Sequence, residues 1–234
     1  MIPLRDTLRP RSFPFVNITI IAINVLVFVV ESIMRTETQA QAFQVYGLIP
    51  AKFWQGEGLA RWIPLITSMF LHAGWWHLIS NMVTLYIFGD NIEDHLGHLW
   101  YVVFYLAGGV VAGAAHLLTN AGSIIPTVGA SGAIAAVLGA YLIMFPRSRI
   151  LTLVPIFYFL RLVEIPAIIY LGFWFVSQLF NGLFALQAAN TVQTGGVAWW
   201  AHIGGFVFGL LITLILPKHM RPPRLRQDWP SQSI

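Results

Sequence analysis

Three groups of polar residues interrupt an apolar sequence, and their side chains could do hydrolytic chemistry. The first group holds His72, His77 and Asn81, the second holds Ser131, and the third holds His202. Polar side chains are costly inside a membrane, so they mark candidate functional sites. A serine hydroxyl is a weak nucleophile that needs an adjacent base, and an imidazole can be that base. Whether Ser131 and His202 can act together depends on the elements that carry them.

The composition is typical of a membrane protein. Of the 234 residues, 57% are apolar and 9% are charged, against about 45–50% and about 25% in ordinary soluble domains. The mean hydropathy is +0.73. These values argue against a soluble globular enzyme and exclude a disordered chain. The chain contains no Cys, which excludes disulfides, a thiol nucleophile and Cys-ligated metals.

Six apolar runs predict six transmembrane helices. About 20 apolar residues cross about 30 Å of hydrocarbon, and runs this continuous favour helices over barrel strands. The predicted helices cover residues 15–34, 75–89, 99–118, 131–145, 165–186 and 199–216. The fold class is therefore an all-α membrane protein, a six-helix bundle with a long first outer loop in the membrane interface. The same pattern leaves open that residues 35–74 are instead a small folded loop against the helix ends.

The charges predict how this bundle lies in the membrane. Most of the 13 Lys and Arg residues fall on the side of both termini, and only Arg35, Lys52 and Arg61 fall on the other. The positive-inside rule then places both termini in the cytoplasm. Residues 1–14 would be a cytoplasmic segment, 15–216 the membrane domain, and 217–234 a basic, disordered cytoplasmic tail. The first run resembles a signal peptide, but the charged residues that follow it favour a retained anchor.

With the N-terminus in the cytoplasm, the second, fourth and sixth predicted helices each start outside and run inward. Ser131 and His202 lie near the outer ends of the fourth and sixth helices, so they lie at similar depth in the membrane. The helix at 131–145 is also short, giving about 22 Å of rise, which is less than the hydrocarbon thickness. The loop at 122–129 should therefore dip into the membrane. Irregular backbone at that depth lies against protein or a water-filled cavity. A hydrolase in a membrane needs such a cavity, because water is a substrate.

Each of these residues also has a purely structural explanation. Ser131 could only cap its helix, and His202 could be an interhelical hydrogen-bond donor. His77 and Asn81 lie four residues apart on one helix face and could form a polar clamp. Residues 205–209 form a small-xxx-small pattern that is typical of a close helix contact. The functional interpretation depends on the depth match, the short helix and the glycines taken together.

Three motifs together resemble the rhomboid intramembrane serine proteases. They are His-Ala-Gly-Trp-Trp-His-Leu-Ile-Ser-Asn-Met (72–82), Gly-Ala-Ser-Gly (129–132) and Ala-His-Ile-Gly-Gly (201–205). Their order and spacing agree with the family, as does the number of predicted helices. The resemblance covers about residues 60–216 and implies a bundle of rhomboid type. We expect a prokaryotic member in the plasma (inner) membrane.

The resemblance implies a role for each motif residue. Ser131 matches the nucleophile and His202 its general base. The residues that match the oxyanion site are His77, Asn81 and the backbone N–H of Ser131. Those that match supporting positions are His72, Gly129, Gly132 and Gly205, and Glu93 matches a structural glutamate at the inner end of the second helix.

Two positions depart from the family pattern. The order Arg61-Trp62 reverses a common Trp-Arg pair, which puts a loop-anchoring arginine in doubt. Ala135 stands one turn after Ser131, where some members carry a Tyr that packs on the catalytic histidine. His202 would then need another support.

The predicted function is cleavage of transmembrane segments in single-span membrane proteins by a Ser–His dyad. The outer acids Glu31, Glu37 and Glu57 do not lie beside the helices of Ser131 or His202, so no third triad member is evident. The family suggests that substrates pass between the second and fifth helices, with residues 187–198 lifting as a cap. The partners are thus membrane-protein substrates and the lipid bilayer, and no cofactor, metal or nucleic acid is expected.

Three other functions fit these residues less well. A catalytically silent relative could only bind membrane clients, but it would lack the dyad. A small transporter or channel could use the histidines as a relay, but no acid lies at the middle of the membrane. A metalloprotease is excluded because the histidines lack His-Glu-x-x-His spacing.

Overall fold

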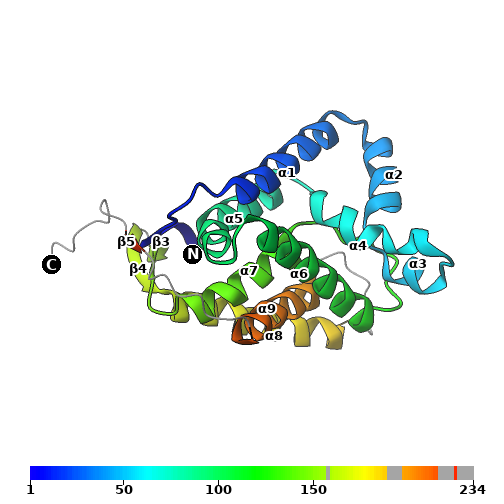
Figure 1. The fold of residues 1–234 in the computed structure, drawn as a ribbon. Coiled ribbons are helices and arrows are strands. Elements are labelled where there is room, and N and C mark those ends of the chain that lie inside the picture. Colours follow the sequence, from blue (N-terminus) through cyan, green and yellow to red (C-terminus); the bar gives the residue numbers. More distant parts are fainter. Residues whose placement is uncertain (157–158, 189–196, 216–223, 226–234) are drawn as a thin grey trace.

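The structure is a computed structural model that describes residues 1–156, 159–188, 197–215 and 224–225. Within these residues, six long helices form a bundle (Figure 1), which confirms the predicted fold class. They are α1 (Phe15–Ile33), α5 (Trp75–Leu96), α6 (His98–Thr119), α7 (Ser131–Met144), α8 (Ala167–Ala188) and α9 (Trp199–Ile215).

The predicted end of the second helix is wrong, and the fifth helix is shifted by two residues from its predicted position. The second helix was expected to stop at Gly89, but α5 continues to Leu96 because Asp90, Asn91 and Glu93 are buried against neighbouring elements. The fifth was expected to start at Ile165, but Ile165 and Pro166 belong to a strand that precedes α8. Buried polar residues and an apolar strand both distort the hydropathy pattern that predicted these ends.

The outward faces of the bundle carry exposed apolar side chains. Leu26 on α1 is 65% exposed, and Phe180 on α8 is 72% exposed. By length and composition, α1, α6 and the first 20 residues of α8 can each span a membrane. The helices α7 and α9 are apolar but shorter, with 14 and 17 residues. Such surfaces are stable in lipid rather than in water, so the chain is an integral membrane protein.

Helix α7 is the centre of the bundle and contacts α5, α6, α8 and α9. All ten residues from Gly132 to Tyr141 are buried. Small residues let α9 approach closely. A Cβ at Gly205 would lie 2.1 Å from the carbonyl oxygen of Gly132, and one at Gly209 would lie 1.9 Å from that of Ala136. The predicted small-xxx-small contact at 205–209 is therefore confirmed.

The first outer loop is folded into short helices. These are α2 (Thr36–Tyr46), α3 (Pro50–Gln55), the 3-10 turn η1 (Leu59–Trp62), α4 (Pro64–Thr67) and the 3-10 turn η2 (Ser68–Phe70). Phe53, Leu65 and Leu117 form a small core that fixes them to α6. Arg61 donates to the carbonyl oxygen of Gly56 at 3.0 Å and lies 5.4 Å from the ring centre of Phe53. Thus Arg61 still ties the loop together in its reversed position.

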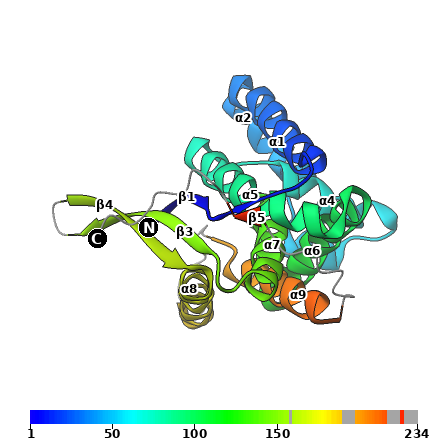
Figure 2. The same cartoon turned by 60° about the vertical axis from the view of Figure 1, so that its left-hand side comes forward.

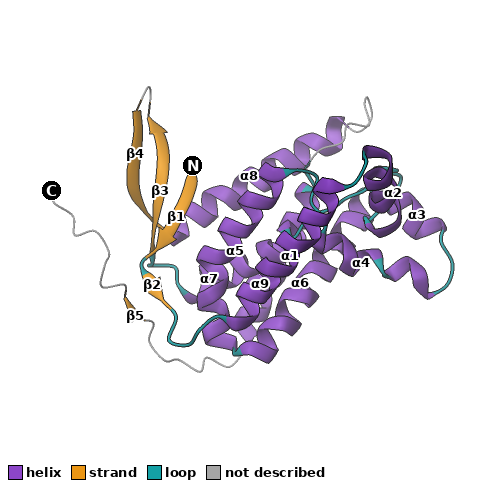
Figure 3. Cartoon of the chain, turned by 90° about the horizontal axis from the view of Figure 1, so that it is seen from above, coloured by secondary structure: helices purple, strands orange, loops and turns teal. Residues whose placement is uncertain are grey.

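The opposite end of the bundle carries strands that the hydropathy pattern did not predict. They are β1 (Ile2–Asp6), β2 (Leu8–Arg9), β3 (Arg149–Ile156), β4 (Phe159–Pro166) and β5 (Arg224–Leu225). The strands β1, β3 and β4 form an antiparallel sheet in that order, and β2 pairs with β5. This sheet extends from the bundle beside α8 (Figure 2) and lies far from α2 and α3 (Figure 3).

Residues 1–14 thus contain two strands. The predicted tail at 217–234 lies outside the described residues, apart from β5.

Glu93 joins three helices at this end. Its two carboxylate oxygens accept hydrogen bonds from the backbone N–H groups of Val16 and Asn17 at 2.9 and 2.7 Å. It also contacts Nδ1 of His98 at 2.5 Å. A carboxylate at a helix N-terminus satisfies unpaired N–H groups and the helix dipole. The structure therefore places Glu93 of α5 where it holds the first residues of α1 and α6.

Candidate active site

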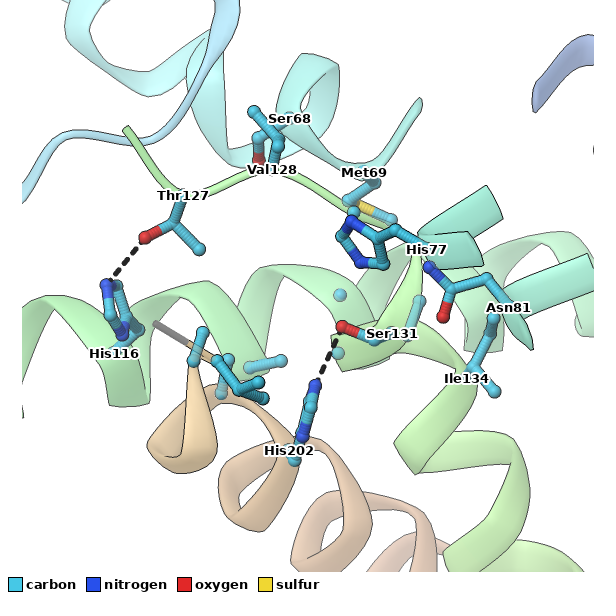
Figure 4. A pocket seen from close by; sticks show the side chains of 18 of the residues that line it. Ser68, Met69, His77, Asn81, His116, Thr127, Val128, Ser131, Ile134 and His202 are labelled. Carbon is cyan, nitrogen blue, oxygen red and sulfur yellow. Dashed lines mark hydrogen bonds between the residues drawn. The ribbon is translucent and has the colours of Figure 1, made fainter. Parts of the chain in front are cut away.

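Ser131 and His202 meet where α7 and α9 begin. Ser131 is the first residue of α7, and His202 lies in the first turn of α9. Nε2 of His202 lies 2.7 Å from Oγ of Ser131 (Figure 4). This is the distance of a strong hydrogen bond. A serine and a base that are 71 positions apart in sequence therefore share one hydrogen bond.

The two side chains face a cavity of about 790 Å³. His77 and Asn81 of α5 line it as well, and so does Gly129 before α7. In Figure 4, His202 lies on one side of Ser131, whereas His77 and Asn81 lie on the other. A reacting carbonyl placed beside Ser131 would thus have a base on one side and N–H donors on the other.

Gly129 allows His77 to lie next to the serine. The φ angle of Gly129 is +129°, which L side chains rarely adopt. A Cβ at this position would lie 2.7 Å from both Cε1 and Nε2 of His77. The N–H of Gly129 donates to the carbonyl oxygen of Ser68 at 2.8 Å, which fixes the loop. Only glycine fits this site without displacing the His77 ring.

Two donors near Ser131 are suited to an anion. Nδ2 of Asn81 is buried, and no described residue accepts a hydrogen bond from it. Buried polar atoms usually have partners, so the unpaired Nδ2 of a residue that lines the cavity is a candidate donor to a group bound beside Ser131. The backbone N–H of Ser131 is at the start of α7, where helical N–H groups lack an intrahelical acceptor.

Gly132 and Gly205 set the distance between the helices of the site. A Cβ at Gly132 would lie 2.7 Å from the Cβ of Ala112 on α6, and one at Gly205 would collide with the backbone of Gly132. The helices α6, α7 and α9 can therefore pack closely here, and this packing brings His202 to Ser131.

His72 does not line this cavity. Its ring is fully buried behind His77, with 5.1 Å between the ring centres. Its backbone N–H donates to Oε2 of Glu31 at 3.2 Å. Burial, together with the proximity of His77, lowers the pKa of His72 to about 4. His72 thus packs as a neutral ring against the candidate oxyanion site.

Gln178 and Trp174 are site residues that the sequence analysis missed. Oε1 of Gln178 lies 2.8 Å from Nδ1 of His202, and the Trp174 ring packs 5.9 Å from the imidazole centre. Both come from α8, whereas Ala135 of α7 contributes no ring. The sequence did contain a signal for Gln178, because it is a polar residue inside an apolar run, and such residues mark candidate functional sites.

His116 is another cavity residue that the sequence analysis missed. Its Nε2 lies 2.8 Å from Oγ1 of Thr127 (Figure 4), and both residues line the cavity. Backbone hydrogen bonds also join Thr127 to Leu48 in both directions. The loop that leads to Ser131 is therefore fixed to α6 and to the first outer loop. His116 also lies within an apolar run, so the same rule would have selected it.

Comparison with known proteins agrees with this architecture. Residues 59–219, more than half of the chain, match the Rhomboid domain. The chain is 29% identical over 170 residues to Rhomboid protein 1, mitochondrial, of Saccharomyces cerevisiae, which covers 70% of this chain and 45% of that protein. It is 31% identical over 155 residues to Presenilin-associated rhomboid-like protein, mitochondrial, of Mus musculus, with 63% and 36% covered.

A third similarity is to the Putative rhomboid protease YdcA of Bacillus subtilis, with 34% identity over 89 residues, or 38% of this chain and 44% of that protein. The chain thus spans less than half the length of these curated relatives. The matched region contains α5 to α9 and all three motifs, at residues 72–82, 129–132 and 201–205. The chain belongs to the rhomboid family.

Proposed function

We propose that the chain is an intramembrane serine endopeptidase that cleaves transmembrane segments of single-span membrane proteins. Ser131 is the nucleophile and His202 is the general base. The observation that carries the proposal is the 2.7 Å contact between Oγ of Ser131 and Nε2 of His202 at the edge of a cavity. Membership of the rhomboid family supports the same reaction class.

The reaction has two halves. As Oγ of Ser131 attacks the carbonyl carbon of the scissile peptide bond, Nε2 of His202 takes the hydroxyl proton. His202 then returns that proton to the leaving amine, which frees one half of the substrate. In the second half, His202 deprotonates a water molecule that attacks the acyl-enzyme ester. As the ester bond to Oγ breaks, His202 returns that proton to Oγ, which releases the new carboxyl end and restores the serine.

The carbonyl oxygen becomes an anion in each half. The proposed donors are the Nδ2 group of Asn81, the ring of His77 and the backbone N–H of Ser131. The unpaired Nδ2 of Asn81 supports this assignment, as does the exclusion of a side chain at Gly129. Donors that are already in place stabilise the transition state without reorganisation. The positive end of the α7 dipole acts in the same direction.

The proposed substrate must unwind before it reacts. A peptide carbonyl inside a helix is bonded to its own helix and is shielded by it. Segments with Gly or Pro near their outer ends are therefore preferred, because such residues weaken helices. The family resemblance favours access between α5 and α8, with residues 187–198 as a cap. Residues 189–196 of that cap lie outside the described residues.

The placement in the membrane is part of the proposal. We place both termini on the cytoplasmic side of a prokaryotic plasma membrane, with the membrane domain at 15–216. The strand-bearing end of the bundle carries Arg5, Arg9 and Arg149, which agrees with the positive-inside rule. Two of the relatives are mitochondrial by name and one is bacterial, so the relatives do not decide between these membranes.

Labelling with a fluorophosphonate probe tests the proposal, because this probe reacts with activated serines. We expect the purified protein in detergent to be labelled, and Ser131→Ala to abolish the label. Ser80→Ala is the matched control, since Ser80 lines the same cavity and donates to the carbonyl oxygen of His77. Its label should persist. Absence of label in the folded wild type would instead favour a catalytically silent rhomboid that binds membrane clients.

A further inference from the structure

His202 is held on the side away from Ser131 by a residue of α8. Its Nδ1 lies 2.8 Å from Oε1 of Gln178, while its Nε2 lies 2.7 Å from the Ser131 hydroxyl. Gln178 is buried, with 5% of its surface exposed. The imidazole thus bridges a serine and an amide, where a catalytic triad has a serine and a carboxylate.

The surroundings of Gln178 decide which atom of its amide faces His202. Its Nε2 donates to the carbonyl oxygen of Trp174 at 3.1 Å and to Oγ of Ser177 at 3.0 Å. The Ser177 hydroxyl donates its own hydrogen to the same Trp174 oxygen at 2.6 Å, so Ser177 Oγ can accept from Gln178. A reversed amide would set Oε1 against that carbonyl oxygen with no hydrogen between them. The network therefore presents Oε1, an acceptor, to His202.

We propose that Gln178 is a positioning residue that fixes the tautomer of His202. A neutral imidazole carries one proton, on either Nδ1 or Nε2. Because Oε1 of Gln178 can only accept, the proton is held on Nδ1. The lone pair is then on Nε2, where the proton of Ser131 must go. This inference rests on the proposed function, and it gives the dyad a neutral third member.

Two aromatic rings complete the support. The ring of Trp174 packs 5.9 Å from the centre of the imidazole at an angle of 34°, and that of Trp199 packs 6.3 Å away at 88°. Trp174 and Gln178 are one turn apart on α8, so a single helix face supplies both the apolar and the polar contact. Trp174 on this face supplies the aromatic contact to His202 that Ala135 cannot make.

Two substitutions test the role of the amide in cleavage. Gln178→Leu keeps a buried side chain of similar size but removes the acceptor. We expect kcat to fall about 10- to 100-fold with little change in KM, which is less than the ~10⁴-fold loss from a wrong tautomer in a serine triad. Gln178→Glu keeps an acceptor toward His202 but sets its second oxygen against the carbonyl oxygen of Trp174, so its activity should lie between those of the wild type and the leucine variant. The carboxylate should also stabilise the imidazolium, which moves the acidic limb of the kcat profile to higher pH.

Asn181→Leu is the matched control. Asn181 lies one turn further along α8, and its amide donates to the carbonyl oxygen of Ser177. This variant should keep the kcat and the pH profile of the wild type. Thermal unfolding of all variants shows whether a loss of activity reflects a loss of folded protein.

A second readout does not depend on cleavage. In ¹⁵N NMR of histidine-labelled protein, His202 should show the Nδ1–H tautomer near neutral pH, assigned by its loss in His202→Gln. In Gln178→Leu, its signal should shift toward the Nε2–H tautomer. An Nε2–H tautomer in the wild type, or the same tautomer and kcat in folded Gln178→Leu, would overturn the proposal. If wild type neither cleaves nor is labelled, the proposed function fails, and the tautomer still decides the role of Gln178.

Discussion

Gly205 packs directly on the backbone of Gly132, with 2.1 Å between the position of a Cβ on Gly205 and the carbonyl oxygen of Gly132. Gly132 is the residue after Ser131, and Gly205 lies three residues after His202. The contact that holds α7 against α9 is therefore within one turn of both reacting side chains. Close backbone packing, rather than a long side-chain network, brings the hydroxyl and the imidazole together.

Substitution of Gly205 by Ala should separate the two helices. Overpacking of a tight core costs about 1–3 kcal/mol, so we expect a lower thermal unfolding temperature and a large loss of cleavage. Gly172→Ala on α8 is the control, because a Cβ there meets nothing within 4 Å. It should leave stability unchanged or raise it slightly, since alanine favours helix. Equal stability and activity in the two variants would contradict this account of the helix contact.

Gly129→Ala should damage the oxyanion site more than the fold. The new Cβ would meet the His77 ring at 2.7 Å and would need a φ of +129°. We expect kcat to fall at least about tenfold as the ring or the loop moves, whereas insertion into membranes should persist. Gly122→Ala in the same loop is the control, because a Cβ there meets nothing within 4 Å. Steady-state cleavage of a model substrate by both variants is the measurement.

Asn81→Ala should remove one oxyanion donor. Loss of one such donor typically lowers kcat by about 10²–10³-fold, or about 3–4 kcal/mol of barrier. The effect should fall on kcat rather than on KM, because the bond strengthens in the transition state. Tyr86→Phe removes a polar atom from the exposed side of the same helix and should have little effect. A kcat for Asn81→Ala within twofold of wild type would remove Asn81 from the site.

The buried His72 predicts an acid-sensitive fold. Its pKa is lowered by burial, and further by His77, from 6.5 to about 4. Between these pH values the unfolded chain binds a proton that the folded chain does not. The free energy of unfolding should therefore be unaffected by His72 above pH 6.5. It should fall as the pH drops from 6.5 toward 4, by up to about 1.4 kcal/mol per pH unit.

Thermal unfolding in detergent between pH 4 and 8 measures this effect. His72→Gln should lose part of the acid sensitivity, since its amide does not titrate in this range. Identical pH dependence in the wild type and His72→Gln would show that other groups control the acid limit.

The sequence predicted much of the bundle because hydropathy is a direct signal for lipid-facing helices. Continuous apolar runs marked all six helices, and polar residues within them marked Ser131, His202, His77 and Asn81 as candidates. The strands β3 and β4 were missed because they are rich in apolar residues, and Ile165 merges with the apolar run of α8. The end of α5 was missed because its last turns bury polar groups against α1 and β1.

The support of His202 was not predicted, for a different reason. Gln178 stands 24 positions before His202, and its contact depends on which face α8 turns toward α9. The rotation of α8 about its own axis cannot be predicted from hydropathy, because this helix is apolar on most of its sides. Examining the acidic residues for a third triad member also could not identify Gln178, because the partner of Nδ1 of His202 is a neutral amide.

The most direct test of the dyad is cleavage by the purified protein in liposomes. A single-span substrate with helix-weakening residues near its outer end should be cut by wild type, and cleavage should be lost in Ser131→Ala and in His202→Ala. Insertion and thermal unfolding show that the variants are folded. Cleavage at the wild-type rate by either folded variant would contradict the assignment of Ser131 and His202 as nucleophile and base.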